Sequence, residues 1–198
     1  TYTLVYPISG EGPIAEHILP NGISACQDQQ IWIAISDSDG VDSSTILVAI
    51  NNDTLACDSP NLLFSNDTLI FSPDSDFWSN NETVCVELIS ADDNHGNILQ
   101  NNPQWTFYLD FQAPSAELII PTDSDTVANI HQNIEIDFTD NLAGVLVDSS
   151  WFEVEGRIFS LGDVIDNISS DSLAGQILFN PDNFSMAWFP GETVDISL

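Results

Sequence analysis

The stretch DTLIFSPDSDFWSNNETVCVEL (Asp67–Leu88) recurs later in the chain as GQILFNPDNFSMAWFPGETVDISL (Gly175–Leu198), and this recurrence decides the fold. Two further matches occur in the same order. GPIAEHILPNG (Gly12–Gly22) matches APSAELIIPTD (Ala113–Asp123), and QIWIAISDSDGVDSS (Gln30–Ser44) matches NIEIDFTDNLAGVLVDSS (Asn133–Ser150). Three ordered matches with the same turn residues are hard to reach by chance, so the chain carries two copies of one module.

Within each copy, apolar residues alternate with polar ones and are interrupted by clusters of Gly, Asn, Asp, Ser and Pro. This pattern is typical of short antiparallel strands with one buried face. About seven such strands per module predict an all-β chain of two tandem immunoglobulin-like β-sandwiches. The residues expected to face the cores are Ile31, Ile33, Ile35, Ile46, Val48, Ile50, Leu69, Phe71, Val84, Val86 and Leu88, with Ile134, Ile136, Phe138, Val194, Ile196 and Leu198 in the second copy.

The two copies differ at their ends. We expect a strand and linker of a preceding or neighbouring module over residues 1–11, a first sandwich over 12–112 and a second over 113–198. WTFYLDF (Trp105–Phe111) closes the first sandwich, whereas the second reaches only Leu198, the counterpart of Leu88, so it is predicted to lack its last strand. A near-copy of the closing strand stands at the start of the chain, at Thr1, Tyr2, Thr3, Leu4, Val5 and Tyr6.

Three interpretations of that N-terminal strand are open. The chain can be a segment of a longer array. Alternatively, residues 1–6 of one molecule complete the second sandwich of the next, which gives a filament joined head to tail by donor-strand complementation. As a third arrangement, the strand folds back within the same chain. An exposed strand edge needs one of these solutions, because its backbone groups are otherwise unpaired.

Four stretches resemble the bacterial immunoglobulin-like (fibronectin-III-like) tandem modules of large extracellular surface proteins: SDSDGVDSSTILVAINN (36–52), LIFSPDSDFWSNNETVCVEL (69–88), ADDNHGN (91–97) and WTFYLDFQAP (105–114). With their repeats they cover nearly all of the first copy and most of the second. The resemblance implies a spacer or adhesion scaffold outside the cell or on its surface, with neighbouring modules or copies of itself as partners and a surface glycan or protein as a further partner. Such motifs define architecture better than function.

The charge is extreme: 31 acidic residues stand against a single basic one, Arg157, for a net charge of −30. Nothing in such a chain neutralises phosphates, so we expect neither nucleic acid nor anionic membrane surfaces as partners, and no membrane insertion. No stretch approaches 18 consecutive apolar residues, and we expect no signal peptide in this sequence. Besides a solvated surface, the acidity suggests divalent cations or a salty habitat.

The acidic loops suggest a calcium site. The turn DSDGVD and the later ADD are expected at the same end of the first sandwich, beside the incoming linker. Their carboxylates suit Ca²⁺, which takes six to eight oxygen ligands, although the spacing departs from an EF-hand loop. Ordinary Asp-rich turns are the alternative. The candidate ligands are Asp37, Asp39, Asp42, Asp92 and Asp93, and their counterparts in the second copy are Asp140 and Asp148, with Asp123 and Asp125 in the linker.

The sequence offers two kinds of candidate covalent modification, a disulfide and N-glycosylation. One disulfide is predicted among Cys26, Cys57 and Cys85 with its pairing open, and Cys85 is expected on an outer face. A zinc site is not expected, because no pair shows the C-x₂-C spacing. Candidate N-glycosylation sites are Asn52, Asn66, Asn81, Asn167 and Asn183.

No nucleophile motif is found, and the three histidines are expected in a linker, a turn and a strand entry, so we predict that the protein is not an enzyme. Trp78 and Trp188 align ahead of NETV and GETV and are expected to plug the sandwiches. Trp32 is expected to face outward. The alternative function is a carbohydrate-binding or accessory module of a secreted enzyme, which would need a second outward aromatic beside Trp32.

Overall fold

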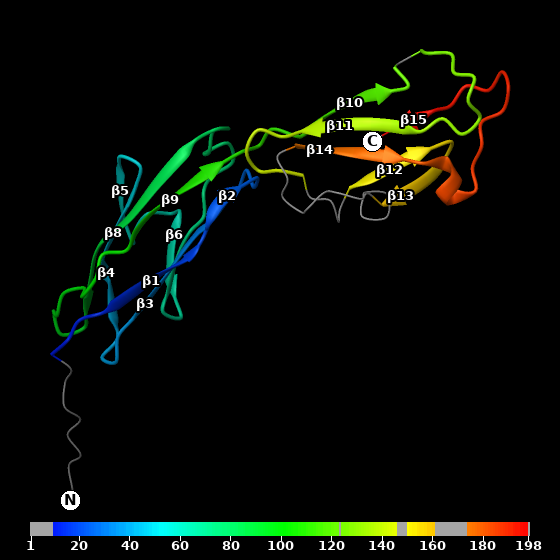
Figure 1. Ribbon diagram of the computed structural model, residues 1–198. Helices are drawn as coiled ribbons and strands as arrows, with labels where there is room; N and C mark the ends of the chain where they lie inside the picture. The colour runs from blue at the N-terminus through cyan, green and yellow to red at the C-terminus, as the bar shows by residue number, and fades with distance from the viewer. Residues whose placement is uncertain (1–9, 123, 146–149, 161–173, 198) are drawn as a thin grey trace, which may run out of the picture. The chain divides into compact units, whose positions relative to one another are not determined.

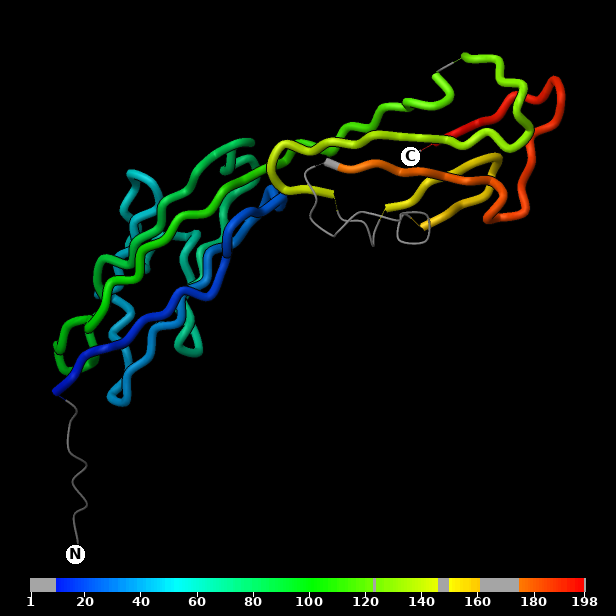
Figure 2. Tube along the Cα trace, in the orientation of Figure 1, coloured from blue at the N-terminus to red at the C-terminus, as the bar shows by residue number. Residues whose placement is uncertain are grey.

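The computed structural model describes residues 10–122, 124–145, 150–160 and 174–197. Figure 1 shows strands joined by turns and loops, and Figure 2 follows the same chain as a Cα trace. The chain divides between Phe111 and Gln112 into two compact units, which we call module one and module two. It is all-β, and each module is an immunoglobulin-like sandwich of two sheets. The described residues contain no helix that is long and apolar enough to cross a membrane.

The described residues of module one form nine strands, more than the seven that the turn spacing predicts. The additional ones are short and lie at sheet edges. The first sheet has the order β1 (Ile14–Leu19), β3 (Ile31–Ser36), β7 (Thr68–Phe71), β6 (Leu62–Ser65). The second has the order β2 (Gly22–Ser24), β9 (Gln104–Leu109), β8 (Thr83–Asp93), β4 (Val41–Ile50), β5 (Asp53–Ala56).

The core of module one is built by alternate residues, as the pattern predicts. Every position expected to face this core is at most 3% exposed. Trp78 plugs the sandwich: its ring packs edge-on against Phe107 at 5.8 Å between centroids, and its Nε1 donates to the Gln29 carbonyl at 2.9 Å. Burying this indole together with a hydrogen-bond partner avoids the cost of an unpaired donor.

The beginning of module one is bound to both sheets. β1 pairs antiparallel with β3, and a register shift between His17 and Leu19 bends the strand away. The chain then passes Pro20 and continues as β2, which pairs parallel with β9 (Gly22 opposite Phe107, Ser24 opposite Leu109). The alternation of apolar residues predicts antiparallel strands, and this pair is an exception: the chain leaves the edge of the first sheet after β1 and joins the edge of the second as β2, in the same direction as β9.

Module two repeats this plan with fewer described strands. One sheet has the order β10 (Ser115–Ile120), β11 (Ile134–Thr139), β14 (Ala174–Phe179), and the other β13 (Arg157–Ser160), β12 (Trp151–Val154), β15 (Ile196–Ser197). A short 3-10 turn, η2 (Pro181–Phe184), follows β14. Trp188 repeats the role of Trp78, since it is buried and its Nε1 donates to the Gln132 carbonyl at 2.9 Å.

The last strand of module two has one partner among the described residues. β15 pairs with β12 through Glu153–Ser197 and Val154–Ile196. Its counterpart in module one, β8, lies between β4 and β9. No described strand occupies the place beside β15 that β9 occupies beside β8.

Candidate functional site

Two acidic loops meet at one end of module one, as the sequence predicts. The Asn94 amide donates to the Gly40 carbonyl at 3.1 Å, and its side chain donates to the Asp39 carbonyl at 2.9 Å. The incoming chain lies beside them, because Gln100 donates to the carbonyls of Pro13 and Gly12 at 2.9 and 2.5 Å. The loop after β3, the loop after β8 and the start of β1 therefore form one tip.

Asp93 is the buried carboxylate of this tip, at 2% exposed. One oxygen accepts from the backbone amides of His95 and Asn97, both at 2.8 Å, and the other accepts from the Asn97 side chain at 2.6 Å. Desolvation raises the pKa of Asp93, but the hydrogen bonds from Asn97 and His95 outweigh it and lower the pKa below the usual 3.8. Asp93 thus holds the turn in shape as an ionised group.

His95 joins this group. Ligand atoms of Asp39, Asp93 and His95 lie within 4.8 Å of one another, and His95 Nδ1 is 3.9 Å from Asp39 Oδ2. The sequence predicts His95 in a turn but not as a neighbour of the acidic cluster. The one sequence signal for that contact is its position two residues after Asp93, in the tight turn Asp-Asn-His-Gly.

The other predicted calcium ligands have local roles. Asp37 Oδ1 accepts from the Asp39 amide at 2.7 Å, which makes an Asx turn. Asp42 Oδ1 accepts from the hydroxyl and amide of Ser44 at 2.7 and 3.0 Å, and these bonds lower the pKa of Asp42. Asp92 stands opposite Asp42 on the neighbouring strand β8.

Of the five predicted ligands, Asp42 and Asp92 form a separate cross-strand pair, and Asp39 and Asp93 lie together. Their partner is an imidazole, whereas Ca²⁺ prefers a shell of oxygens. The two oxygens of Asp93 also already accept hydrogen bonds. The five-carboxylate calcium site stays a prediction. A cation bound by Asp93 would have to compete with the hydrogen bonds that its oxygens accept from His95 and Asn97.

The corresponding turn in module two is organised in the same way. Asp140 Oδ1 accepts from the amides of Leu142 and Gly144 at 3.0 and 2.7 Å. Asp125 Oδ2 accepts from the Thr122 hydroxyl at 2.6 Å. Asp123 and Asp148 lie outside the described residues. An Asp at the start of this turn therefore stabilises it in both modules, whatever else it binds.

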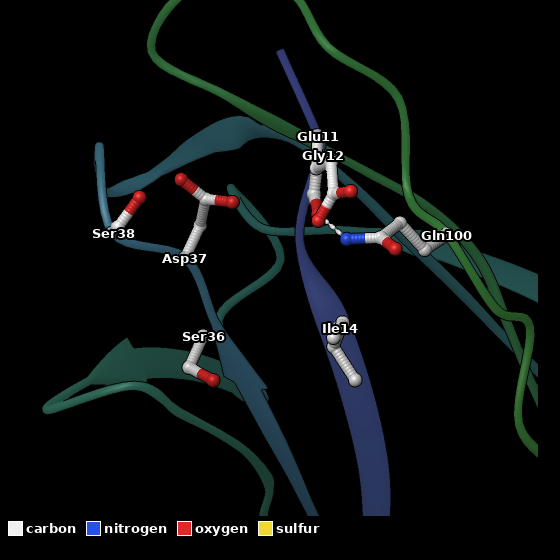
Figure 3. A pocket seen from close by; sticks show the side chains of 7 residues that line it. All are labelled: Glu11, Gly12, Ile14, Ser36, Asp37, Ser38 and Gln100. Carbon is white, nitrogen blue, oxygen red and sulfur yellow. Dashed lines mark hydrogen bonds between the residues drawn. The ribbon is translucent and has the colours of Figure 1, made fainter. Parts of the chain in front are cut away.

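A shallow pocket of about 260 Å³ is lined by Asp37 and by residues at the start of β1. Figure 3 shows Asp37 and Ser38 on one side of it, with Glu11, Ile14 and Gln100 on the other. The dashed line in the figure is the bond from Gln100 to the Gly12 carbonyl. The pocket is lined by two carboxylates, so its chemistry favours cationic over anionic ligands.

All three cysteines are free thiols in the structure, and no disulfide joins them. Cys26 lies in the loop after β2, Cys57 follows β5, and Cys85 is exposed on β8. Cys57 packs against the core of module one, and desolvation raises the pKa of its thiol. Cys85 faces outward as expected, because it alternates with the buried Val84 and Val86.

The predicted glycosylation sites lie in turns where the structure describes them. Asn52, Asn66 and Asn81 are exposed in turns of module one, and Asn183 is exposed in η2. Asn167 lies outside the described residues, as do the donor-strand candidates Thr1–Tyr6. These asparagines remain predicted modification sites, with access to solvent in four of the five cases.

Trp32 faces outward from β3 but is only partly exposed. Its Nε1 donates to the Gln30 side chain at 3.0 Å, and its neighbours across the strands are the aliphatic residues Leu19 and Ile70. The indole is thus part of an apolar row that crosses this sheet.

No protein-family model matches the chain, and the curated proteins contain no match to it. Among solved structures, the chain is similar to titin A168169, at 13% identity and a TM-score of 0.34, with 94% of this chain and 95% of that chain covered. It is also similar to a tetra-tandem repeat in the extending region of a large adhesion protein, at 13% identity and a TM-score of 0.33. In that case 85% of this chain is covered, and the chain spans 40% of the length of the other.

Proposed function

We propose that the chain is a structural segment of an extracellular or cell-surface repeat protein or filament, in which the modules hold spacing and transmit tension. The observation that carries this proposal is the parallel pairing of β2 with β9 in module one. Neighbouring modules are the partners that such a segment requires.

Tension along the chain would load this pair in shear. A pull on the N-terminal side draws β2 backward along its own direction, and a pull on the C-terminal side draws β9 forward. Because the two strands are parallel, the pulls oppose each other along the strand axis. Their hydrogen bonds then bear the load together and not one after another. A short pair in this geometry resists force better than its contribution to equilibrium stability suggests.

The start of β1 is fastened in support. The Asn101 side chain bonds both the amide and the carbonyl of Ala15, and Gln100 bonds the carbonyls of Gly12 and Pro13. The chain is thereby tied, at the point where β1 begins, to the loop that precedes β9. This arrangement suits a module through which force passes from end to end.

The surface charge fits the same role. With a net charge of −30, copies and modules repel each other except where specific contacts form, which favours extended, soluble arrays over collapsed ones. Adhesion to a surface glycan or protein would be an additional property of such an array.

Single-molecule pulling of the whole chain tests the proposal through Ser24, whose backbone faces β9, since its carbonyl accepts from the Asp110 amide at 3.0 Å. Ser24→Pro removes the backbone donor that this residue turns toward β9, whereas Ser24→Ala keeps that donor and removes the hydroxyl bonds to Gln29 and Cys26. We expect the unfolding force of module one to be clearly lower in Ser24→Pro than in Ser24→Ala. Equal forces in the two variants would contradict the shear role of β2 and β9.

A further inference from the structure

We propose that the open edge of β15 in module two accepts residues Thr1–Tyr6 of a second copy as an added antiparallel strand. This inference rests on the proposed structural function and names the joint between copies. The acceptor is built only from described residues of module two. The donor segment lies outside the described residues, and only its sequence enters the argument.

Among the described residues, equivalent positions are less buried at this edge of module two than at the same edge of module one. In module one, Val84 and Val86 of β8 are 0% and 1% exposed. Their counterparts Val194 and Ile196 are only partly buried against the core of module two. In module one, the inward side chains of β9, Phe107 and Leu109, are 0% exposed and complete the core.

Backbone amides and carbonyls at this edge point in the direction that an added strand requires. The amide and carbonyl of Asp195 are engaged with Glu155, toward β12, at 2.6 and 3.1 Å. Backbone groups of successive strand residues point to opposite sides. Those of Ile196, and of Val194 just before β15, therefore point away from β12, toward the position that no described strand occupies.

The turn before β15 offers the remaining contacts. In module one, the Asn81 amide donates to the Leu109 carbonyl at 2.8 Å, and the Leu109 amide donates to the Glu82 carbonyl at 2.9 Å. The counterparts of these turn residues are Gly191 and Glu192. Glu192 also repeats the side-chain bond of Glu82, since its Oε2 accepts from the Phe189 amide at 2.6 Å as Glu82 Oε2 does from Ser79 at 2.9 Å. The turn is thus already shaped for a strand.

The second wall of the acceptor also lacks a strand among the described residues. In module one, the segment after Pro20 forms β2 along the other side of β9. The corresponding segment after Pro121 forms no strand among its described residues. It carries Val127 and Ile130 with 41% and 50% of their surfaces exposed. An added strand would lie between β15 and this segment, as β9 lies between β8 and β2.

Residues 1–6 have the pattern that this site requires. Tyr2, Leu4 and Tyr6 alternate as the inward positions Trp105, Phe107 and Leu109 do, and Thr3 matches Thr106. The β8–β9 register places Leu4 opposite Val194 and Tyr2 opposite Ile196. Pro7 stands at the position of Asp110 and has no amide to repeat the bond from Asp110 to Ser24 of β2, so the match to β9 ends at Tyr6. The six residues are uncharged in a chain of net charge −30, so they add no side-chain repulsion.

Light scattering of the full chain over a range of concentrations tests the proposal, with a matched pair of substitutions. Leu4→Asp places a charge at an inward position, and Thr3→Asp places the same charge at the adjacent outward position. We expect the wild type and Thr3→Asp to associate with rising concentration, and Leu4→Asp to associate at least about tenfold more weakly. Association that both substitutions weaken equally, or a monomer at every concentration, would overturn the proposal.

Two further readouts fix the site and the source of the strand. Amide hydrogen exchange on the associated chain should slow at Val194 and Ile196, and a synthetic peptide of sequence TYTLVY should compete and shorten the oligomers. Slowed exchange in a chain that stays monomeric would place the strand within its own molecule and overturn the second copy as donor. The unfolding force of module one in Leu4→Asp stays at the wild-type value, so a failed joint and a failed tension-bearing role are told apart.

Discussion

Asn101 holds Ala15 by both backbone groups: its Oδ1 accepts from the Ala15 amide at 2.9 Å and its Nδ2 donates to the Ala15 carbonyl at 2.7 Å. Ala15 is 1% exposed. One side chain thus acts as a short neighbouring strand for β1. It ties the start of module one to the loop before β9.

Replacing Asn101 therefore tests how firmly β1 is held. Asn101→Ala leaves a buried amide and carbonyl without partners, and we expect the free energy of unfolding of module one to fall by about 1–3 kcal/mol. Asn21→Ala is the matched control, because Asn21 is exposed and makes one long bond to the Ile18 carbonyl at 3.4 Å. Urea denaturation measures both. A similar small effect of the two substitutions would contradict the role assigned to Asn101.

Gly12 gives a second test of the same tip. A Cβ at this position would collide with the Ile98 carbonyl, a backbone group that cannot move aside easily. We expect Gly12→Ala to destabilise module one by about 1–3 kcal/mol, the usual range for overpacking. Gly10→Ala has open space around the new methyl group and should change the free energy of unfolding by at most about 0.5 kcal/mol. Thermal unfolding of the two variants gives the comparison, and equal melting temperatures would refute it.

The contribution of Asp93 to the stability of module one is expected to depend on pH. Its pKa in the folded protein lies below 3.8, because hydrogen bonds to its oxygens outweigh desolvation. A depressed pKa stabilises the folded state fully above the unfolded-state pKa, and this stability is lost as the pH falls through the folded-state value. We expect Asp93→Asn to be less stable than the wild type at pH 7, and the gap to shrink below pH 3.8. A gap that is constant from pH 7 to pH 3 would show that the charge has no part in it.

The thiols give a prediction about exposure. Cys26 and Cys85 are exposed, whereas Cys57 packs against the core and desolvation raises the pKa of its thiol. Because the thiolate is the reactive form, iodoacetamide at pH 8 should label Cys26 and Cys85 before Cys57 in the folded protein. Peptide mass mapping at successive times measures the order, with labelling of the unfolded chain as the control. Early labelling of Cys57 would contradict its packed position.

Much of the fold could be predicted from the sequence, because the buried faces of long strands leave a period-two pattern. Ile31, Ile33 and Ile35 face the core as expected, as do Ile134, Ile136 and Phe138 in the repeat. The tryptophans before NETV and GETV also plug their cores as expected. The pairing of β2 with β9 could not be foreseen, since three residues carry no period and the partner is distant in the chain.

The candidate site was less accessible to sequence reasoning. Asp residues in turns look alike in a sequence, yet Asp37 and Asp42 accept bonds from their own turns while Asp93 is buried. The expected topology was enough to predict that the loops after β3 and β8 meet at one end of module one. Which side chains converge depends on turn conformation, such as the positive φ of 83° at Gly40, and so the approach of His95 to Asp39 was missed.

The most direct test of the central claim is single-molecule pulling of the 198-residue chain by its two ends at a concentration where copies do not associate. In module one, β2 and β9 pair in parallel, so tension between the two ends would load them in shear, whereas β15 of module two is held by β12 over two residue pairs. We predict two separate unfolding events, with module two yielding first and module one at a clearly higher force. Two events at the same low force would contradict a tension-bearing structural role.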